Sequence, residues 1–318
     1  MGSAAPAPGS SPGRPTPNGS SVVVASVRQL DAADPSPPVR AHASHGRAAG
    51  RTLRLILSTP MPELPEVERA RALIAARALH RPIAAVDDAD TYVCRPHAPG
   101  EIADALVGRQ LEAVHRRGKS MWLETSGDGP VLGLHLGMAG RIVVDDAEAG
   151  DPPPRVERPG WDRFTIRFAD GGHLVLRDSR RLGRARLEPD VERLGPDAAE
   201  VSRAEFRARV GRGDAPVKAR LMDQAVIAGV GNLLADETLW RARIDPRRPA
   251  GALDEAELDR LRLELRAATR SAIAKGGVHT GDVIPARRRD GACPRCGAPM
   301  VRATIGGRTT WWCPDEQR

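Results

Sequence analysis

One stretch of the chain places several reactive residue types side by side, Met61-Pro62-Glu63-Leu64-Pro65-Glu66-Val67-Glu68. If Met61 is an initiator that is removed, Pro62 becomes a free secondary amine, which can attack an aldehyde-like carbon and form an iminium. An internal Pro62 has an amide nitrogen and lacks this chemistry. Glu63 and Glu66 would lie beside the amine, where a carboxyl group can shuttle protons. The same two acids also suit the start of a helix without any catalytic role.

Three of the four cysteines lie close together near the end of the chain, at Cys293, Cys296 and Cys313. The first two form a Cys-x-x-Cys turn, which is typical of tetrahedral zinc sites. Glu316 stands where a second such turn would have its last cysteine, and a carboxylate is a less common zinc ligand. The pattern favours a four-residue zinc site over a metal-free hairpin. Cys94 is expected to be a plain thiol, and nothing in the spacing suggests disulfides, which fits a reducing cytoplasm.

Basic residues gather in short runs, although the net charge is modest. The formal net charge is +7, but the first sixty residues hold six arginines and two aspartates and so carry +4 of it. The remaining +3 would not by itself indicate a nucleic-acid partner. The runs at 116–119, 177–186 and 287–289 do point to one, because they concentrate cations locally. Solvated surface charge is the alternative for each run taken singly.

Residues 1–60 are rich in Ala, Pro, Ser and Gly and show no helical or strand periodicity before Leu53. Such a composition buries too little apolar surface to fold. The segment has no signal-peptide pattern and no apolar run long enough to cross a bilayer. We interpret it as a disordered tail or, preferably, as translated upstream sequence. The residues from Met61 onward suit one compact protein of two or three modules, expected to be a cytoplasmic monomer.

Periodicity divides the chain after Met61 into a strand-rich half and a helical half. Pro65 suits the first turn of a helix that runs to about Leu79. Strand patterns follow at 110–115, 120–124, 131–136, 163–168 and 173–177, with a hairpin turn at 169–172. Helical patterns follow at 216–227, 233–243 and 254–275.

A glycine-rich break, Gly229-Val230-Gly231-Asn232, separates two of the expected helices. It predicts a helix that begins near Asn232 with exposed backbone amides. Free N–H groups at a helix start can bind phosphate. A simple capped helix hairpin explains the same residues, so both interpretations stay open from the local sequence.

Four motifs in order give the chain from Met61 onward a resemblance to the formamidopyrimidine-DNA glycosylase and endonuclease VIII family of bacterial DNA glycosylases. They are the Met61–Glu68 stretch, Arg116-Arg117-Gly118-Lys119, Gly229–Glu237, and the cysteine segment with Gly306-Gly307-Arg308. The resemblance implies an α+β multidomain fold. Its parts are an N-terminal β-sandwich with flanking helices at 61–190, a helix-two-turn-helix domain at 196–276 and a zinc-finger β-hairpin at 290–318. Damaged double-stranded DNA is the implied partner and Zn²⁺ the implied metal.

The family's mechanism, carried over to matching positions, implies a catalytic role for four residues. Pro62 would attack C1′ of the damaged nucleotide, and Glu63 would give a proton to the deoxyribose ring. Glu66 would be a supporting acid and Lys119 a cation beside the reacting nucleotide. The implied activity is that of a base-excision-repair glycosylase for oxidised bases with class I AP lyase activity, which proceeds by β,δ-elimination.

Further matches imply contacts with DNA. Lys119, Asn232 and Arg308 would hold phosphates around a nucleotide that is flipped out of the duplex. Side chains that fill the space left by the flipped base match Met138, Arg180 and Leu182. Without the resemblance, a core methionine and a surface arginine would be the simpler interpretations.

Two departures from the family pattern bear on substrate choice. Leu182 stands where the oxidised-guanine enzymes usually carry a phenylalanine. Residues 276–285 reach Cys293 sooner than in enzymes that close a loop over oxidised guanine, which argues against a preference for 8-oxoguanine. A different class of function is a non-catalytic protein of the same fold that binds lesions or abasic sites. It applies if residues 1–60 stay attached, because Pro62 then has no free amine.

Overall fold

The computed structural model describes residues 61–148 and 159–318. The first sixty residues, for which the sequence predicts a tail or upstream translated sequence, lie outside the described residues. In the part of the chain that is described, no helix is both long enough and apolar enough to cross a membrane.

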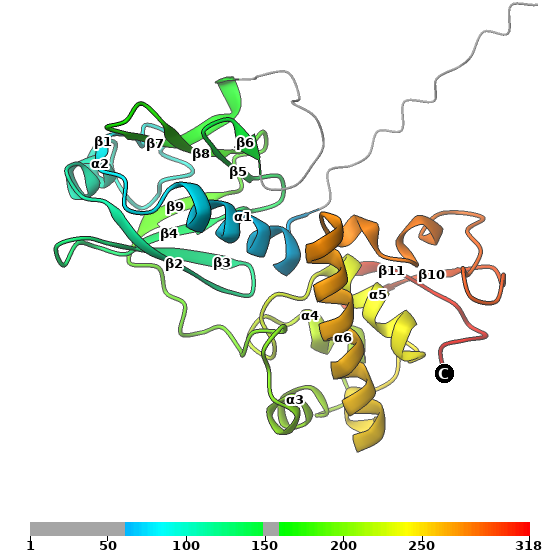
Figure 1. Cartoon of the computed structure of the whole chain (residues 1–318). Helices are drawn as coiled ribbons and strands as arrows, with labels where there is room; N and C mark the ends of the chain where they lie inside the picture. Colours follow the sequence, from blue (N-terminus) through cyan, green and yellow to red (C-terminus); the bar gives the residue numbers. More distant parts are fainter. Residues whose placement is uncertain (1–60, 149–158) are drawn as a thin grey trace, which may run out of the picture. The chain divides into compact units, whose positions relative to one another are not determined.

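Two antiparallel sheets make up the strand-rich half (Figure 1). Five strands follow the order β1-β7-β8-β5-β6, and four follow the order β2-β3-β4-β9. Leu123 of the second sheet and Phe164 of the first belong to one buried cluster, so the sheets share a core as a β-sandwich. The strands are β1 (Ile83–Asp87), β2 (Leu111–Arg117), β3 (Ser120–Thr125), β4 (Leu132–His135), β5 (Arg141–Val144), β6 (Ala147–Glu148), β7 (Asp162–Phe168), β8 (His173–Arg177) and β9 (Arg184–Leu187).

Two helices accompany the sandwich. Helix α1 (Leu64–Arg77) has Pro65 in its first turn, where the missing N–H costs nothing, and it contacts β2, β5 and the long helix α6. Helix α2 (Glu101–Leu106) begins where the buried Asp88 carboxylate accepts backbone N–H groups, including those of Gly100 (2.7 Å) and Ile102 (2.9 Å). Charged and polar capping of this kind satisfies amides that a helix start leaves open.

The helical half has its own buried core, which is built around α5 and α6. Helix α6 begins at a capping box between Asp254 and Glu257 and ends at Gly276, whose φ of 104° suits glycine. Its helices are α3 (Arg203–Val210), α4 (Val217–Met222), α5 (Asn232–Ala242) and α6 (Glu255–Lys275). Short 3₁₀ turns lie at Pro159–Trp161, Ala250–Ala252, Val278–Thr280 and Ile284–Ala286.

The last element is a β-hairpin of β10 (Val301–Ile305) and β11 (Arg308–Trp312), which turns at two glycines with positive φ. It contacts α5 through β11. The mixed α+β fold predicted from the sequence is therefore confirmed: a β-sandwich with flanking helices, a helical domain and a C-terminal hairpin next to a cysteine cluster.

One predicted helix is shorter than expected. The sequence pattern predicts a helix over 216–227, but α4 ends at Met222. Asp223 ends it, because its carboxylate accepts the N–H of Ala225 (3.0 Å) and its carbonyl accepts the N–H of Ile227 (3.0 Å). A local side-chain turn therefore replaces the last helical turn.

Candidate active site

Glu63 joins the start of α1 to the start of α5. Its carboxylate accepts hydrogen bonds from the backbone N–H groups of Gly231 (2.9 Å), Leu233 (2.9 Å) and Leu234 (3.0 Å). Position 231 requires glycine, since a Cβ there would lie 2.3 Å from Glu63 Cδ. The sequence left open whether the amides near Asn232 bind phosphate or are capped. In the structure, these three amides are capped by Glu63.

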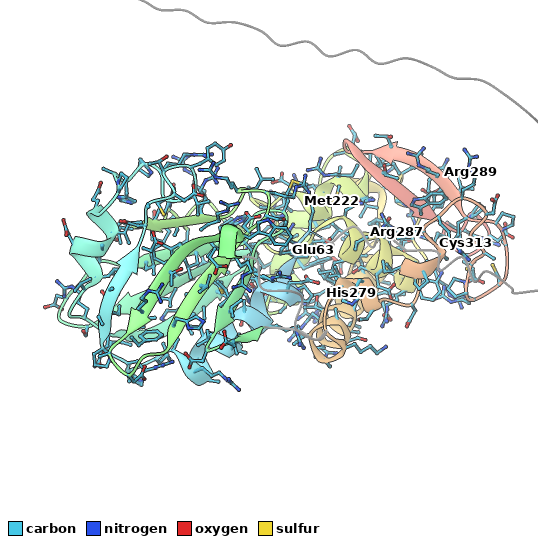
Figure 2. The ribbon with its side chains drawn as sticks, turned by 90° about the horizontal axis from the view of Figure 1, so that it is seen from above. Glu63, Met222, His279, Arg287, Arg289 and Cys313 are labelled. Carbon is cyan, nitrogen blue, oxygen red and sulfur yellow. The ribbon has the colours of Figure 1, made fainter. Side chains whose placement is uncertain are left out.

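Burial dominates the electrostatics of this carboxyl group. It raises the pKa of Glu63 to about 7, although the charge of Lys119 and the N–H donors of α5 oppose the rise. The group therefore exchanges its proton near neutral pH, which is the property required of a general acid. Figure 2 shows Glu63 among side chains of both halves of the described chain.

The residues on either side of Glu63 are also fixed in place, by burial or by hydrogen bonds. Pro62 is buried directly before it. Glu66 accepts the N–H of Glu63 (3.0 Å) with one oxygen and the N–H of Val278 (2.7 Å) with the other. Burial raises the pKa of Glu66 as well. Glu66 thus ties the segment from Pro62 to Glu66 both to the first turn of α1 and to the 3₁₀ turn that begins at Val278.

Lys119 is brought to the same place by close packing of backbones. It lies in the β2–β3 turn after Gly118, where φ is 60° and a Cβ would lie 2.7 Å from Gly229 N. Gly229 in turn meets Leu64, since a Cβ there would lie 2.6 Å from Leu64 Cδ1. Burial lowers the pKa of Lys119, while Glu63 raises it through charge. The predicted residues Pro62, Glu63, Glu66 and Lys119 therefore gather at one site.

His135, which was not predicted as a site residue from the sequence, also belongs to this site. Its Nδ1 accepts the N–H of Gly137 at 3.0 Å, so the neutral ring carries its hydrogen on Nε2. Burial lowers the pKa of His135, and the charge of Lys119 lowers it further. Its position at the end of a strand pattern, three residues before Met138, was the signal available in the sequence.

Two of the predicted phosphate-binding residues meet at the hairpin. Asn232, the first residue of α5, donates from Nδ2 to the carbonyl of Thr309 (3.1 Å), next to Arg308. Arg308 is exposed, and its charge contributes to the lowered pKa of Lys119. The hairpin turn packs on α4, since a Cβ at Gly306 would lie 2.8 Å from the Ala219 Cβ.

A buried ion-pair network behind Arg308 was not predicted. Lys218 is fully buried, and its Nζ lies 2.7 Å from Asp236 Oδ1 and 2.7 Å from Thr310 Oγ1. Arg287, labelled in Figure 2, donates to the other Asp236 oxygen at 2.7 Å. The network fastens β11 to α4 and α5. In the sequence, Lys218 was indistinguishable from a surface cation, because its partner Asp236 lies in another helix.

The predicted wedge residues lie in two neighbouring turns. Asp178 is fully buried, and its carboxylate accepts the N–H groups of Arg180 (2.8 Å) and Leu182 (2.7 Å). Gly137, just before Met138, approaches so closely that a Cβ there would lie 2.4 Å from the Leu182 carbonyl carbon. Arg180 is exposed, whereas Met138 and Leu182 are half-buried. The three side chains therefore come from adjoining turns.

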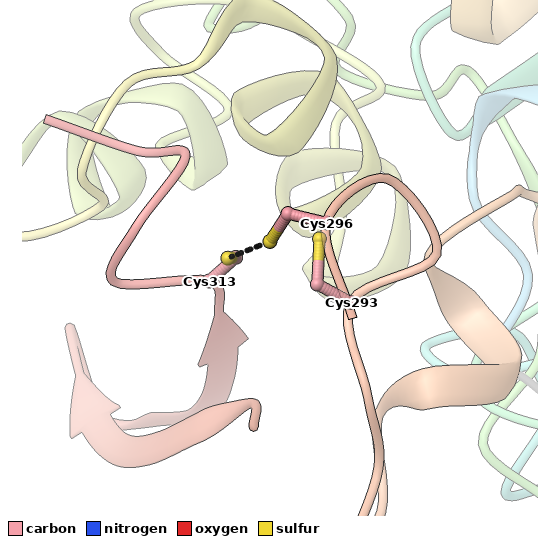
Figure 3. A group of neighbouring side chains, drawn as sticks. All are labelled: Cys293, Cys296 and Cys313. Carbon is pink, nitrogen blue, oxygen red and sulfur yellow. Dashed lines mark hydrogen bonds between the residues drawn. The ribbon is translucent and has the colours of Figure 1, made fainter. Parts of the chain in front are cut away.

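The cysteine cluster is only partly as predicted (Figure 3). The sulfur atoms of Cys293, Cys296 and Cys313 all lie within 4.8 Å of one another. Glu316, the fourth ligand expected from the sequence, is not in the cluster. Its carboxylate instead pairs with Arg295 (3.1 Å) and Arg243 (3.6 Å). Guanidinium groups bind a carboxylate readily, so the carboxylate is engaged away from the thiols.

The donor set still suits a metal ion. Three thiols at this separation match the three-sulfur part of a tetrahedral zinc site. The indole N–H of Trp240 donates to Cys293 Sγ at 3.4 Å, which is a contact typical of a thiolate ligand. Cys94 lies in the sandwich core and takes no part.

Comparison with known proteins agrees with this arrangement. The family model described as the formamidopyrimidine-DNA glycosylase N-terminal domain matches residues 61–185, and the model of the formamidopyrimidine-DNA glycosylase H2TH domain matches residues 194–282. A formamidopyrimidine-DNA glycosylase of Roseiflexus sp. (strain RS-1) is 38% identical over 281 residues, which cover 81% of this chain and 100% of that protein. One of Geobacter sulfurreducens is 34% identical, with the same coverage of each chain. The chain belongs to the formamidopyrimidine-DNA glycosylase family.

Solved structures are similar along the same part of the chain. The complex of Lactococcus lactis Fpg (MutM) with a DNA containing an oxidized pyrimidine has a TM-score of 0.68 and 27% identity, and it covers 81% of this chain and 100% of that one. The structure of MutM with DNA containing carbocyclic 8-oxo-G gives the same TM-score, identity and coverage.

Proposed function

We propose that this chain, begun at Met61, is a base-excision-repair DNA glycosylase for oxidised bases that also cleaves the strand as a class I AP lyase. The observation that carries the proposal is the Glu63 carboxyl group, which is buried against α5, has a pKa of about 7 and adjoins Pro62. Membership of the family supports the glycosylase class. Its partner would be damaged double-stranded DNA, and we expect a cytoplasmic monomer.

The first step would join Pro62 to the sugar. The amine lone pair of Pro62 forms a bond to C1′, and the base departs with the electron pair of the glycosidic bond and takes a proton from water. The nitrogen then gives its hydrogen to water, and its lone pair forms C1′=N⁺ as the C1′–O4′ bond breaks. Glu63 gives its proton to O4′, because a carboxyl group with this pKa is substantially protonated at neutral pH.

The iminium would then draw electrons from the sugar. Loss of a proton from C2′ expels the 3′ phosphate, and loss of a second proton along the conjugated chain expels the 5′ phosphate. Water adds to C1′ of the iminium, the C1′–N bond breaks, and Pro62 is freed as an amine. Glu66 lies one helical turn from Glu63 and supports these proton transfers, while Lys119 supplies a positive charge beside the phosphates.

The DNA contacts would be divided between the two halves of the described chain. Asn232 and Arg308 would hold phosphates of the flipped nucleotide together with Lys119. The adjoining turns that carry Met138 and Leu182 would fill the space left in the duplex, with Arg180 beside them. Flipping costs a few kcal/mol per base, so such side chains must offset the lost stacking.

A zinc ion would be held by Cys293, Cys296 and Cys313. When bound, it supplies a structural crosslink and no chemistry of base removal, because the cluster lies at the base of the hairpin. The hairpin residues themselves present Arg308 from β11, and Lys218 and Asp236 hold that strand against the helices.

The products of one reaction test the proposal. A duplex with a single oxidised base, labelled at either end, is incubated with the chain that begins at Met61. We expect both fragments at the break to end in phosphate, since β,δ-elimination expels both. Release of the base without strand cleavage would contradict the lyase part. Tight binding with neither product would leave the non-catalytic alternative of a lesion-binding protein.

A further inference from the structure

The outer face of the four-stranded sheet carries a row of polar and basic side chains that leads away from Lys119. The strand register aligns Arg117 with Ser120, Ser120 with His135, and His135 with Arg184. Directly opposed residues in antiparallel strands point to the same face of a sheet, with Cβ atoms about 5 Å apart. The row therefore runs across all four strands, from the turn that carries Lys119 to the edge strand β9.

A second row lies two residues further along each strand. It aligns His115 with Trp122, Trp122 with Gly133, and Gly133 with Arg186. The rings of His115 and Trp122 are stacked, with centroids 5.6 Å apart. The residues between the two rows point to the opposite face and are buried in the sandwich core, as the period of two requires: Met121, Leu134 and Ala185.

The parts of both rows that lie on β4 and β9, together with Ser120 of β3, line a pocket with a volume of about 610 Å³. Ser120, His135, Arg184 and Arg186 line it. Gly133 contributes no side chain, and a Cβ there would lie 2.6 Å from the Pro189 Cβ. The hollow thus depends on glycine at the middle of the second row.

Charge in the pocket is mainly positive and uncompensated. Arg95, Arg184 and Arg186 line it, and none of them forms an ion pair within the described residues. The lining carboxylate, Asp190, already pairs with Arg193 at 3.1 Å. By comparison, Arg81, Arg116 and Arg207 elsewhere in the chain each pair with two carboxylates.

An aromatic ring holds two of these guanidinium groups in place. Tyr92 is 45% exposed, and the guanidinium carbons of Arg95 and Arg184 lie 4.0 Å and 5.2 Å from its ring centroid. Cation–π contacts of this kind order an arginine without neutralising its charge. The guanidinium groups of Arg95 and Arg184 are thereby ordered beside the pocket, and they keep their charge and their N–H donors.

We propose that this pocket is an additional phosphate-binding subsite, in which Arg184 and Arg186 hold the backbone of the DNA strand beyond the phosphates near Lys119. The proposal rests on the proposed function for its partner, DNA. Ser120 and His135 connect the pocket to Lys119 along the sheet. This continuity supports a DNA backbone that runs from Lys119 to the pocket. Arginine forks match phosphate oxygens in two directions, which suits a polymer backbone at this place.

Salt dependence of binding tests the subsite directly. Affinity for an abasic-site duplex is measured over a range of salt concentrations for the wild type, Arg184→Gln/Arg186→Gln and Arg184→Lys/Arg186→Lys. The glutamine pair removes about two phosphate contacts, so the slope of log K against log salt should fall by roughly 2. The lysine pair keeps the charges and should stay near the wild-type slope. An unchanged slope in the glutamine pair overturns the proposal.

Control experiments distinguish an effect of this subsite from an effect of overall net charge and from an effect on catalysis. Arg209→Gln/Arg270→Gln removes the same net charge from exposed positions of α3 and α6 and should keep the wild-type slope. Shortening the duplex on one flank should weaken the wild type and leave the Arg184/Arg186 glutamine pair unaffected. Equal sensitivity of both to every shortening contradicts the subsite. Strand cleavage by all forms at low salt shows that the proposed function stands even if the subsite fails.

Discussion

At the scale of single residues, Glu63 combines a structural contact between two helices with a raised pKa. It precedes α1, and its carboxylate caps α5 through three backbone N–H groups. Burial raises its pKa to about 7, against the effect of those same donors. The result is a carboxyl group that titrates near neutral pH and whose position is fixed by two helices. Preorganised groups of this kind need little reorganisation during a reaction.

Replacing Glu63 by Gln should abolish base removal while DNA binding persists. A positioned general acid contributes about 10²–10⁴-fold to a rate, so single-turnover excision should fall by at least that range. In the wild type, the rate should decline as pH rises above about 7, because the acid loses its proton. Excision kinetics across pH measure both effects. Glu192→Gln, an exposed substitution, should change neither.

The same pKa shift predicts a stability effect with a definite sign. A raised carboxyl pKa means that the folded chain binds the proton more tightly than the unfolded chain. This contribution is fully present below pH 4.5 and is lost as pH rises through about 7. The Gln variant should lack this part of the pH dependence of unfolding. A difference between variant and wild type that stays constant from pH 4.5 to 8 contradicts the assigned pKa.

At the scale of elements, the sequence predicted what depends on local pattern. The hairpin around 169–172 joins β7 and β8, and α6 begins at Glu255, one residue after the start at Asp254 that the helical pattern predicts. Strand β9 was missed because Arg184-Ala185-Arg186-Leu187 is charged, and only its place at a sheet edge allows this. The bond from Glu63 to Gly231 could not be predicted locally, since 168 residues separate the two.

The cysteine cluster shows a similar limit, because spacing in the sequence does not fix which residues meet in space. Glu316 lies where a ligand is expected, but two arginines from other segments hold its carboxylate. Glu316→Gln should therefore keep about one zinc per chain, whereas Cys313→Ser should lose it. Elemental analysis after dialysis against a weak chelator measures the content. Loss of zinc from the Gln variant would restore Glu316 as a ligand.

At the scale of the whole molecule, a buried ion-pair group joins β2 to α1 and to the segment before α3. Arg116 donates to Glu68 at 2.8 Å and also pairs with Asp197, and both members of the second pair are less than 10% exposed. Asp197 further accepts the N–H of Gly118 at 2.7 Å, next to Lys119. The position of Lys119 thus depends on contacts between distant parts of the sequence.

Asp197→Asn should lower the free energy of unfolding by about 3–5 kcal/mol, because it leaves Arg116 buried with one partner fewer. Denaturant unfolding measures the change. The exposed substitution Asp214→Asn should stay within about 0.5 kcal/mol of the wild type. A loss under 1 kcal/mol at Asp197 would mean that the pair contributes little to joining these segments.

The proposed reaction depends most on Pro62 as a nucleophile, which needs a free amine. Borohydride reduces an iminium and so traps it as a covalent link between protein and DNA. The test uses a duplex with one abasic site, the chain begun at Met61, its Pro62→Gly variant and the full 318-residue chain. We predict strong trapping by the chain begun at Met61, little by Pro62→Gly and none at Pro62 in the full chain. Tight binding of the shorter chain without any adduct would contradict the iminium mechanism and leave a DNA-binding protein without catalysis.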